Sequence, residues 1–183
     1  MPILPAEPDC LPDDLLDLSD AAEREWWLLY VRSRQEKMLM RQLRTLGIPH
    51  YGPQVPQRKR SPNGRFRTSH VPLFAGYVFL QGDNEARYHA VCTGCILKAD
   101  PIPDTETLVR DLRQIRDLIG LGVPLTIESR LEPGQPVRIR SGAFTGYEGT
   151  ILRREQETRL LVAVRFMEQG VSVKLEDCQL EPL

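Results

Sequence analysis

The sequence predicts an α+β protein, in which an antiparallel sheet packed with helices is joined by a linker to a small five-stranded β-barrel. Apolar and aromatic runs alternate with helical patterns over residues 26–119. Residues 120–131 lack a clear periodicity and contain glycine and proline, as linkers do. Residues 132–183 hold short β-branched runs separated by glycines. Residues 1–25 form an acidic extension outside both predicted domains.

The extension at residues 1–25 contains four prolines, eight acids and one base. Such a composition buries little apolar surface, so it predicts a segment without a fixed conformation or a short docked helix. The segment could bind a partner or the basic domain, or it could be a simple tail.

Charge is distributed unevenly along the chain. Residues 26–119 carry fifteen bases and eight acids, a net charge of +7, whereas residues 120–183 carry eight bases and nine acids. A basic domain beside an acidic segment suggests a polyanionic partner that the segment could mimic or screen. Charges that merely keep the surface soluble explain the same pattern.

Residues 71–80 form the stretch around which the first domain is organised. Tyr77 to Leu80 is aromatic and β-branched and predicts a strand, which Pro72 and Gly76 keep irregular at its start. Tyr77 and Phe79 share one face of that strand because strand side chains alternate. That face is either core or a docking surface.

A helix is expected to follow the strand at Trp26 to Arg32. Ser33 and Glu36 have the spacing of a capping box, and the helical pattern runs to about Leu46. A row of cations without interleaved acids follows one side of this helix; a phosphate backbone or plain solvent could face it. These cations are Arg34, Lys37, Arg41 and Arg44.

Residues 58–67 predict a hairpin tip exposed to water. Five cations surround a Pro-Asn-Gly turn in this segment. The tip could contact nucleic acid nonspecifically, and it could equally be a solvated loop.

The sequence does not predict an enzyme, a metal site or a cofactor. Cys92 and Cys95 form a lone C-x-x-C without a second ligand pair, and the three histidines are scattered. No catalytic or phosphate-loop motif occurs. No apolar run approaches the roughly 18 residues of a membrane span, so we expect a cytoplasmic protein without a membrane partner.

Three ordered motifs resemble the NusG family of transcription elongation factors, with a first domain closest to the RfaH kind. They are Trp-Trp-Leu-Leu-Tyr at residues 26–30, Pro-Leu-Phe-Ala-Gly-Tyr-Val-Phe at residues 72–79, and Glu-Pro-Gly-Gln-Pro-Val-Arg-Ile at residues 132–139 with the glycine-rich residues 142–149. The resemblance implies a ferredoxin-like polymerase-binding domain of the NGN type and a KOW domain with an SH3-like barrel.

The resemblance also implies where partners bind. In the family, the equivalents of Tyr30, Phe74, Tyr77 and Phe79 line a cavity that receives the clamp helices of RNA polymerase. The resemblance further implies contacts with the polymerase gate loop by Glu85, Arg87 and Tyr88 and with the nontemplate DNA strand by Arg32, Arg34, Lys37 and Arg41.

Within the second domain, Phe166 and Met167 occupy the loop through which the general factor meets the termination factor Rho or a ribosomal protein. The glycine and arginine of that family loop are missing, which argues against recruitment of Rho and favours a specialised antiterminator, for which a ribosomal protein could be the partner. The sequence thus predicts a monomeric elongation and antitermination factor that bridges the polymerase cleft and suppresses pausing. A ribosome-associated or RNA-binding KOW protein is the alternative.

Overall fold

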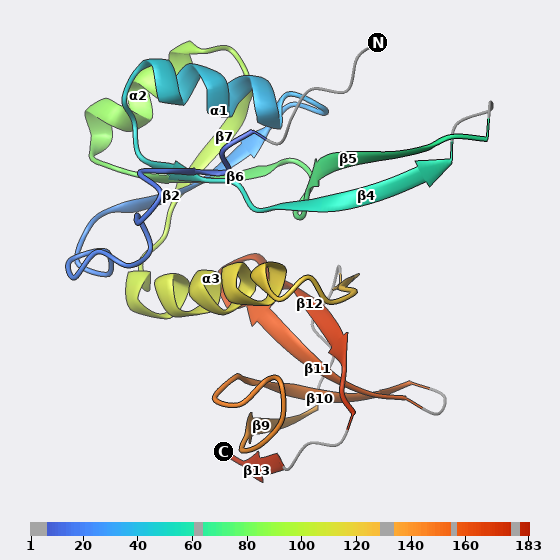
Figure 1. The fold of residues 1–183 in the computed structure, drawn as a ribbon. Coiled ribbons are helices and arrows are strands. Elements are labelled where there is room, and N and C mark those ends of the chain that lie inside the picture. The colour runs from blue at the N-terminus through green and yellow to red at the C-terminus, as the bar shows by residue number, and fades with distance from the viewer. Residues whose placement is uncertain (1–6, 61–63, 129–133, 155–156, 177–179) are drawn as a thin grey trace. The chain divides into compact units, whose positions relative to one another are not determined.

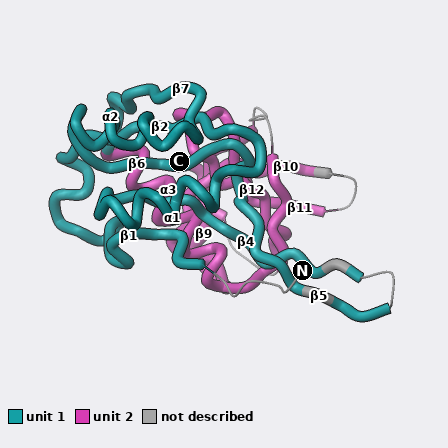
Figure 2. Tube along the Cα trace, turned by 90° about the horizontal axis from the view of Figure 1, so that it is seen from above, with its two compact units in different colours: residues 1–105 teal, residues 106–183 magenta. Residues whose placement is uncertain are grey.

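The computed structural model describes residues 7–60, 64–128, 134–154, 157–176 and 180–183. The chain divides into two compact units, residues 1–105 and residues 106–183, which Figure 2 distinguishes by colour. The sequence predicts a domain boundary within residues 120–131, and the division in the structure falls earlier in the chain.

The first unit is built on a five-stranded antiparallel sheet, in which β2 (Trp26–Val31) lies between β6 (Tyr77–Gln81) and β7 (Ile96–Pro101). Because β2 and β6 are apolar on both faces, they occupy the inner part of the sheet, where both faces are covered. In spatial order the strands are β1 (Cys10–Leu11), β3 (His50–Tyr51), β6 (Tyr77–Gln81), β2 (Trp26–Val31) and β7 (Ile96–Pro101).

Helices α1 (Glu36–Thr45) and α2 (Asn84–Cys92) lie on one side of this sheet (Figure 1). Buried side chains of the helices and of the strands beneath them form one core, which includes Leu39, Leu43 and Val78. The antiparallel sheets and the helices confirm the predicted mixture of α and β structure.

Residues 7–25 of the acidic extension are packed into the first unit. This differs from the expectation of a segment without fixed conformation. Strand β1 pairs with β3, and the Gly52 N–H donates to the carbonyl oxygen of Asp9 at 2.7 Å. Leu15 and Leu16 are fully buried. Backbone pairing at a sheet edge and two buried leucines fix the segment despite its composition.

Strands β4 (Gln54–Arg60) and β5 (Phe66–Pro72) form a separate two-stranded ribbon. Figure 1 shows the ribbon extending away from the main sheet. At its outer part the guanidinium carbon of Arg58 lies 4.2 Å from the centre of the exposed Phe66 ring. A hairpin is therefore present where the sequence predicts one, and the predicted turn at residues 61–63 lies outside the described residues.

The second unit contains helix α3 (Thr105–Gly120) and a six-stranded antiparallel sheet. Within this unit the helix binds the strands through side chains: Gln114 accepts from the Glu148 N–H at 2.8 Å, and Asp111 accepts from the Arg165 N–H at 3.1 Å. In spatial order the strands are β13 (Leu180–Pro182), β9 (Gln135–Ile139), β10 (Glu148–Arg154), β11 (Glu157–Val164), β12 (Gln169–Lys174) and β8 (Thr126–Glu128).

Strand β8 comes from the segment that the sequence predicts to be a linker. It pairs with β12, and a buried polar chain fixes it there. Arg159 Nε donates to the Ser172 hydroxyl at 2.9 Å, and that hydroxyl donates to the buried Glu128 carboxylate at 2.6 Å. The sequence gives no local signal for this strand, because Ser172, which donates to Glu128, is more than forty residues away in sequence.

The five strands predicted in the second domain are present, and β8 is an additional one. Among the described residues the pairings run from β13 to β8 without a pairing that joins these two end strands. The closed SH3-like barrel is therefore not confirmed and remains a prediction.

His50 provides a pH-dependent contribution to stability. The side chain is fully buried, its Nδ1 lies 2.8 Å from the carbonyl oxygen of Ile48, and its Nε2 has no hydrogen-bond partner among the described residues. Burial lowers the pKa of His50 below its usual value. The unfolded chain therefore binds a proton at a higher pH than the folded chain does.

We expect the free energy of unfolding to fall as the pH drops below about 6.5, because protons then bind the unfolded chain first and the loss ends at the lowered folded pKa. Urea titrations at pH 8, 7, 6 and 5 measure this. A His50→Leu variant removes the titrating group, so its pH profile should be flatter in this range. Identical profiles for the two proteins would contradict the assignment to His50.

Candidate functional site

An aromatic surface lies where β2, β6 and β7 run side by side. Tyr30 of β2 is paired with Tyr77 of the neighbouring strand β6 and with Lys98 of the neighbouring strand β7. The two tyrosine rings are 5.4 Å apart in an edge-on arrangement, and the Lys98 ammonium lies 5.3 Å from the Tyr30 ring centre. We call Tyr30, Tyr77, Lys98 and Asp100 the tyrosine surface.

The tyrosine surface combines partly exposed rings with charges. Tyr30 and Tyr77 are half-buried, and Lys98 Nζ forms an ion pair with Asp100 at 2.7 Å. Burial is the main cause that raises the pKa of the Tyr30 phenol, and the neighbouring Asp100 carboxylate adds to it. The Tyr30 phenol therefore stays neutral at physiological pH, and both rings offer apolar area and a polar tip to a partner.

The other two predicted aromatic contacts are buried. Phe79 is 0% exposed and pairs with Leu28, and Phe74 is 2% exposed. The structure thus brings Tyr30 and Tyr77 together at the surface and encloses Phe74 and Phe79. The alternation of side chains places Tyr77 and Phe79 on one face, as predicted, but it does not tell which part of that face stays accessible.

Glu36 holds the loop that leads into β6. Its buried carboxylate accepts from the Gly76 N–H at 2.7 Å, and the Gly76 carbonyl accepts from the Val31 N–H at 2.8 Å. Gly76 has a φ of +84°, a conformation that favours glycine. The predicted capping box is therefore wrong: Gln35 is the N-cap of α1 without a side-chain cap, and Glu36 contacts the loop instead of Ser33.

The predicted gate-loop residues lie on α2, whose N-cap is Asp83; the Asp83 carboxylate accepts from the Ala86 N–H at 2.9 Å. Glu85 and Tyr88 are exposed. Arg87 is fixed by two contacts: its Nε donates to the Asn84 side chain at 2.7 Å, and its guanidinium carbon lies 5.2 Å from the Trp27 ring centre. Tyr88, which is 62% exposed, therefore presents a large aromatic ring on α2.

Of the four predicted nucleic-acid contacts, Arg32 and Arg34 precede α1 and Lys37 and Arg41 lie on it. Arg34 has a φ of +63° and is therefore not part of the helical row that the sequence predicts. Arg32, Arg34 and Arg41 are exposed, and Lys37 is half-buried.

An acid missed by the sequence analysis lies beside these cations. Glu7 accepts from Arg41 Nε at 2.9 Å and from Arg41 Nη2 at 2.5 Å, and its carboxylate lies 3.2 Å from Arg44 Nη2. No local sequence signal could reveal this contact, because 34 residues separate Glu7 from Arg41.

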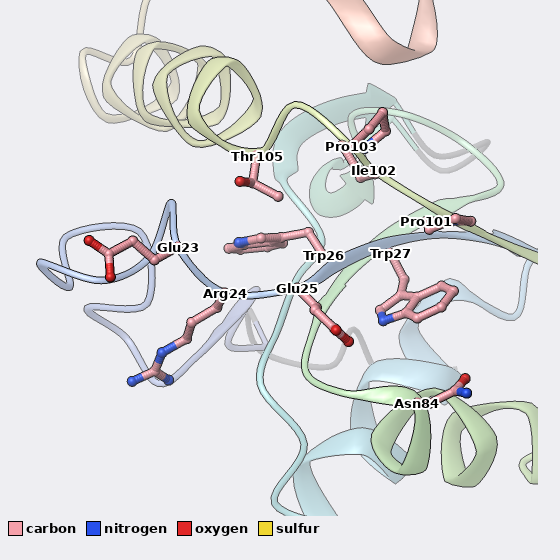
Figure 3. A pocket seen from close by; sticks show the side chains of 10 residues that line it. All are labelled: Glu23, Arg24, Glu25, Trp26, Trp27, Asn84, Pro101, Ile102, Pro103 and Thr105. Atoms are coloured by element: carbon pink, nitrogen blue, oxygen red, sulfur yellow. The ribbon is translucent and has the colours of Figure 1, made fainter.

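A pocket of about 440 Å³ lies at the opposite end of β2 from Tyr30, where the paired tryptophans begin the strand. Figure 3 shows the rings of Trp26 and Trp27 turned to opposite sides of the chain. Their indole N–H groups donate to Ala21 and Gly82 carbonyls at 2.8 and 2.9 Å. The pocket is lined by Glu23, Arg24, Glu25, Trp26, Trp27, Asn84, Pro101, Ile102, Pro103 and Thr105.

In the second unit, Phe166 and Met167 belong to a short 3-10 helix at Arg165–Met167 between β11 and β12. Phe166 is exposed and Met167 is half-buried. The helix ends at Glu168, whose φ is +53°. The two predicted contact residues therefore present apolar surface to solvent.

The described ranges of the chain also bear on metal binding and on membrane insertion. No group of three or more histidine, cysteine or acidic residues in these ranges could hold a metal ion. None of the helices described is both long and apolar enough to cross a membrane.

Comparisons with known proteins agree with the resemblance seen in the sequence. The family model described as "Transcription termination factor nusG" matches residues 24–131. The transcription termination/antitermination protein NusG of Pseudomonas aeruginosa is 29% identical over 177 residues, which cover 86% of this chain and 98% of that protein. NusG of Buchnera aphidicola subsp. Baizongia pistaciae is 29% identical over 131 residues, 64% of this chain and 69% of its own length.

Two solved structures are also similar. The structure described as "Domain interaction in Thermotoga maritima NusG" is 22% identical, with a TM-score of 0.45 and coverage of 84% of this chain and 93% of that one. The structure described as "Crystal Structure of MjSpt4:Spt5 complex conformation B" is 16% identical, with a TM-score of 0.25. The match covers 86% of this chain and 97% of that one.

The fold and the surfaces described above define a two-unit α+β protein that exposes aromatic and basic groups. The chain belongs to the NusG family of transcription termination and antitermination factors.

Proposed function

We propose that this protein binds the clamp helices of RNA polymerase through the tyrosine surface and acts as an elongation and antitermination factor. The observation that carries the proposal is the pair of half-buried rings of Tyr30 and Tyr77, 5.4 Å apart beside the Lys98–Asp100 ion pair. Aromatic rings supply large contact area at a small entropic cost, which is why tyrosine dominates binding hot spots.

Phe74 and Phe79 support this surface from within. Since both are buried, they contribute to binding by fixing the backbone that carries Tyr77, whose N–H donates to the Phe74 carbonyl at 3.3 Å. The proposal therefore keeps the four predicted residues as one site, with the tyrosines as direct contacts and the phenylalanines as support.

A second contact on the polymerase would come from α2. Glu85 and Tyr88 are exposed there, and Arg87 is held in place by Trp27 and Asn84. A protein that contacts both sides of the polymerase cleft disfavours opening of the cleft. It suppresses pausing only if it binds the active form more tightly than the paused form.

The basic residues Arg32, Arg34, Lys37 and Arg41 are proposed to contact phosphates of the nontemplate DNA strand. Residues 132–183 of the second unit, which we propose to be a KOW domain, would bind a further protein, such as a ribosomal protein, through Phe166 and Met167. The nearly balanced charge of residues 120–183, eight bases and nine acids, does not favour direct RNA binding by this domain.

Replacing Tyr77 with alanine is expected to weaken binding to purified RNA polymerase about tenfold or more, because hot-spot truncations cost more than about 1.4 kcal/mol. Fluorescence anisotropy of the labelled full chain measures the Kd. Phe66→Ala removes another exposed ring from the same unit, far from the tyrosine surface along the ribbon, and should bind as the wild type does.

An unchanged Kd for Tyr77→Ala would refute the proposed surface. Transcription of a pause-containing template with and without the protein tests the activity, and the pause lifetime should shorten with the wild type and less with Tyr77→Ala. Capture of ribosomal subunits instead of polymerase would favour a ribosome-associated protein.

A further inference from the structure

The N-terminal segment is attached to the basic side of α1 by both its backbone and a carboxylate. Glu7 Oε1 and Oε2 accept from Nη2 and Nε of Arg41, the two-pronged arrangement in which arginine also binds phosphate. Arg44 contacts the same carboxylate at 3.2 Å, and its Nη1 donates to the Pro8 carbonyl at 2.6 Å. Four donor atoms thus converge on two adjacent residues of the segment.

The contact is electrostatically favourable for an anion at this position. The hydrogen bond from Arg41 is the largest influence on the Glu7 carboxyl group and, with the charges of Lys37 and Arg44, holds its pKa below the usual value although burial acts in the opposite direction. The side chain of Glu7 is 14% exposed, whereas that of Arg41 is 49% exposed. Arg41 therefore remains reachable from solvent while it holds the carboxylate.

Backbone contacts keep the segment near the two arginines even when the carboxylate is released. The Gly52 N–H donates to the Asp9 carbonyl at 2.7 Å, and β1 pairs with β3. A short tethered segment of this kind has a high effective concentration at the site that it occupies.

We infer that Arg41 and Arg44 form a phosphate-binding site for nucleic acid and that Glu7 occupies this site as an intramolecular competitor. The inference rests on the proposed function, which places Arg41 against the nontemplate strand, and it adds Arg44 as a second ligand and Glu7 as the regulator. A backbone phosphate entering the site displaces the Glu7 carboxylate, and the bidentate contact passes from carboxylate to phosphate. Nucleic-acid binding by the free protein is correspondingly weakened.

A Glu7→Gln variant of the full chain tests the inference. It keeps the size of the side chain and removes the competing charge, so a fluorescein-labelled 20-nucleotide single-stranded DNA should bind about threefold to tenfold more tightly than to the wild type at low salt. Asp13→Asn is the matched control. It removes the same charge from an exposed position of the same segment and should change the Kd by much less.

The higher DNA affinity of the Glu7→Gln variant must depend on Arg41 and Arg44. In the Glu7→Gln background, replacing Arg41 and Arg44 with glutamine should abolish the gain and reduce the dependence of the Kd on salt concentration, because fewer counterions are released.

The outcomes separate this inference from the proposed function. Equal affinity of Glu7→Gln and wild type, with weakened binding by Arg32→Gln or Lys37→Gln, would overturn the inference and leave DNA binding by the basic residues intact. No DNA binding by any of these proteins would overturn both the inference and the proposed DNA contact, while polymerase binding through Tyr77 would be unaffected.

Discussion

Replacing Phe79 with alanine is expected to lower the free energy of unfolding of the first unit by about 3–5 kcal/mol, the usual cost of truncating a buried phenylalanine. The Phe79 side chain is completely buried in an inner strand, so the deleted ring leaves a cavity that the paired strands cannot close easily. Both tryptophans of the chain, Trp26 and Trp27, lie in the first unit, so tryptophan fluorescence during urea titration reports its unfolding directly.

Phe79→Leu provides the matched control. It keeps most of the buried volume and should cost about 1.5 kcal/mol or less. If Phe79 acts as a support, the leucine variant should also bind polymerase with an affinity close to that of the wild type, in contrast to Tyr77→Ala. A leucine variant that folds stably but loses polymerase binding would instead make Phe79 a direct contact.

The regular elements of the first unit could be predicted because their signals are local. The aromatic and β-branched residues from Tyr77 to Leu80 predict a strand, and the observed β6 extends it by one residue to Gln81. The predicted strand from Trp26 to Arg32 is found at Trp26–Val31. The periodicity of apolar residues shows which faces of a strand must be buried. This information suffices to locate the central strands in the sequence.

The acidic segment shows why composition alone misjudges a short stretch. Proline and acidic residues lower the average hydrophobicity of residues 1–25, but the edge strand β1 pairs through backbone groups alone, and Leu15 and Leu16 beyond it bury the segment. Backbone pairing of β1 with β3 has no side-chain signature that a sequence reader could detect. For the same reason, the sequence does not reveal that Glu7 forms an ion pair with Arg41 and thereby occupies its guanidinium.

The candidate site was predicted as a set of residues but not as a geometry. Tyr30, Phe74, Tyr77 and Phe79 come from two segments that the structure brings together, yet only the two tyrosines remain partly exposed. Whether a face of a strand is exposed to solvent depends on the side chains that pack against it, and these come from distant parts of the chain. The exposure of the four rings could therefore not be predicted from the local sequence.

Glu36→Ala is expected to destabilise the first unit by about 1.5–3 kcal/mol, because it removes the buried charged acceptor of the Gly76 N–H. The same change should weaken polymerase binding, since the Gly76 carbonyl also accepts from Val31, the neighbour of Tyr30 in β2. The loop would then no longer fix Tyr77 against Tyr30. Urea unfolding and the polymerase Kd measure the two effects separately.

Glu36→Gln retains an acceptor oxygen and should recover part of both losses. If Glu36 acts only by positioning the loop, the double variant Glu36→Ala with Tyr77→Ala should bind polymerase hardly less well than Tyr77→Ala alone, because one surface is lost in either case. Additive losses would mean that Glu36 affects binding independently of Tyr77. A Glu36→Ala variant that loses stability yet binds polymerase normally would show that the tyrosine surface is fixed by the pairing of β2 with β6 and not by the loop.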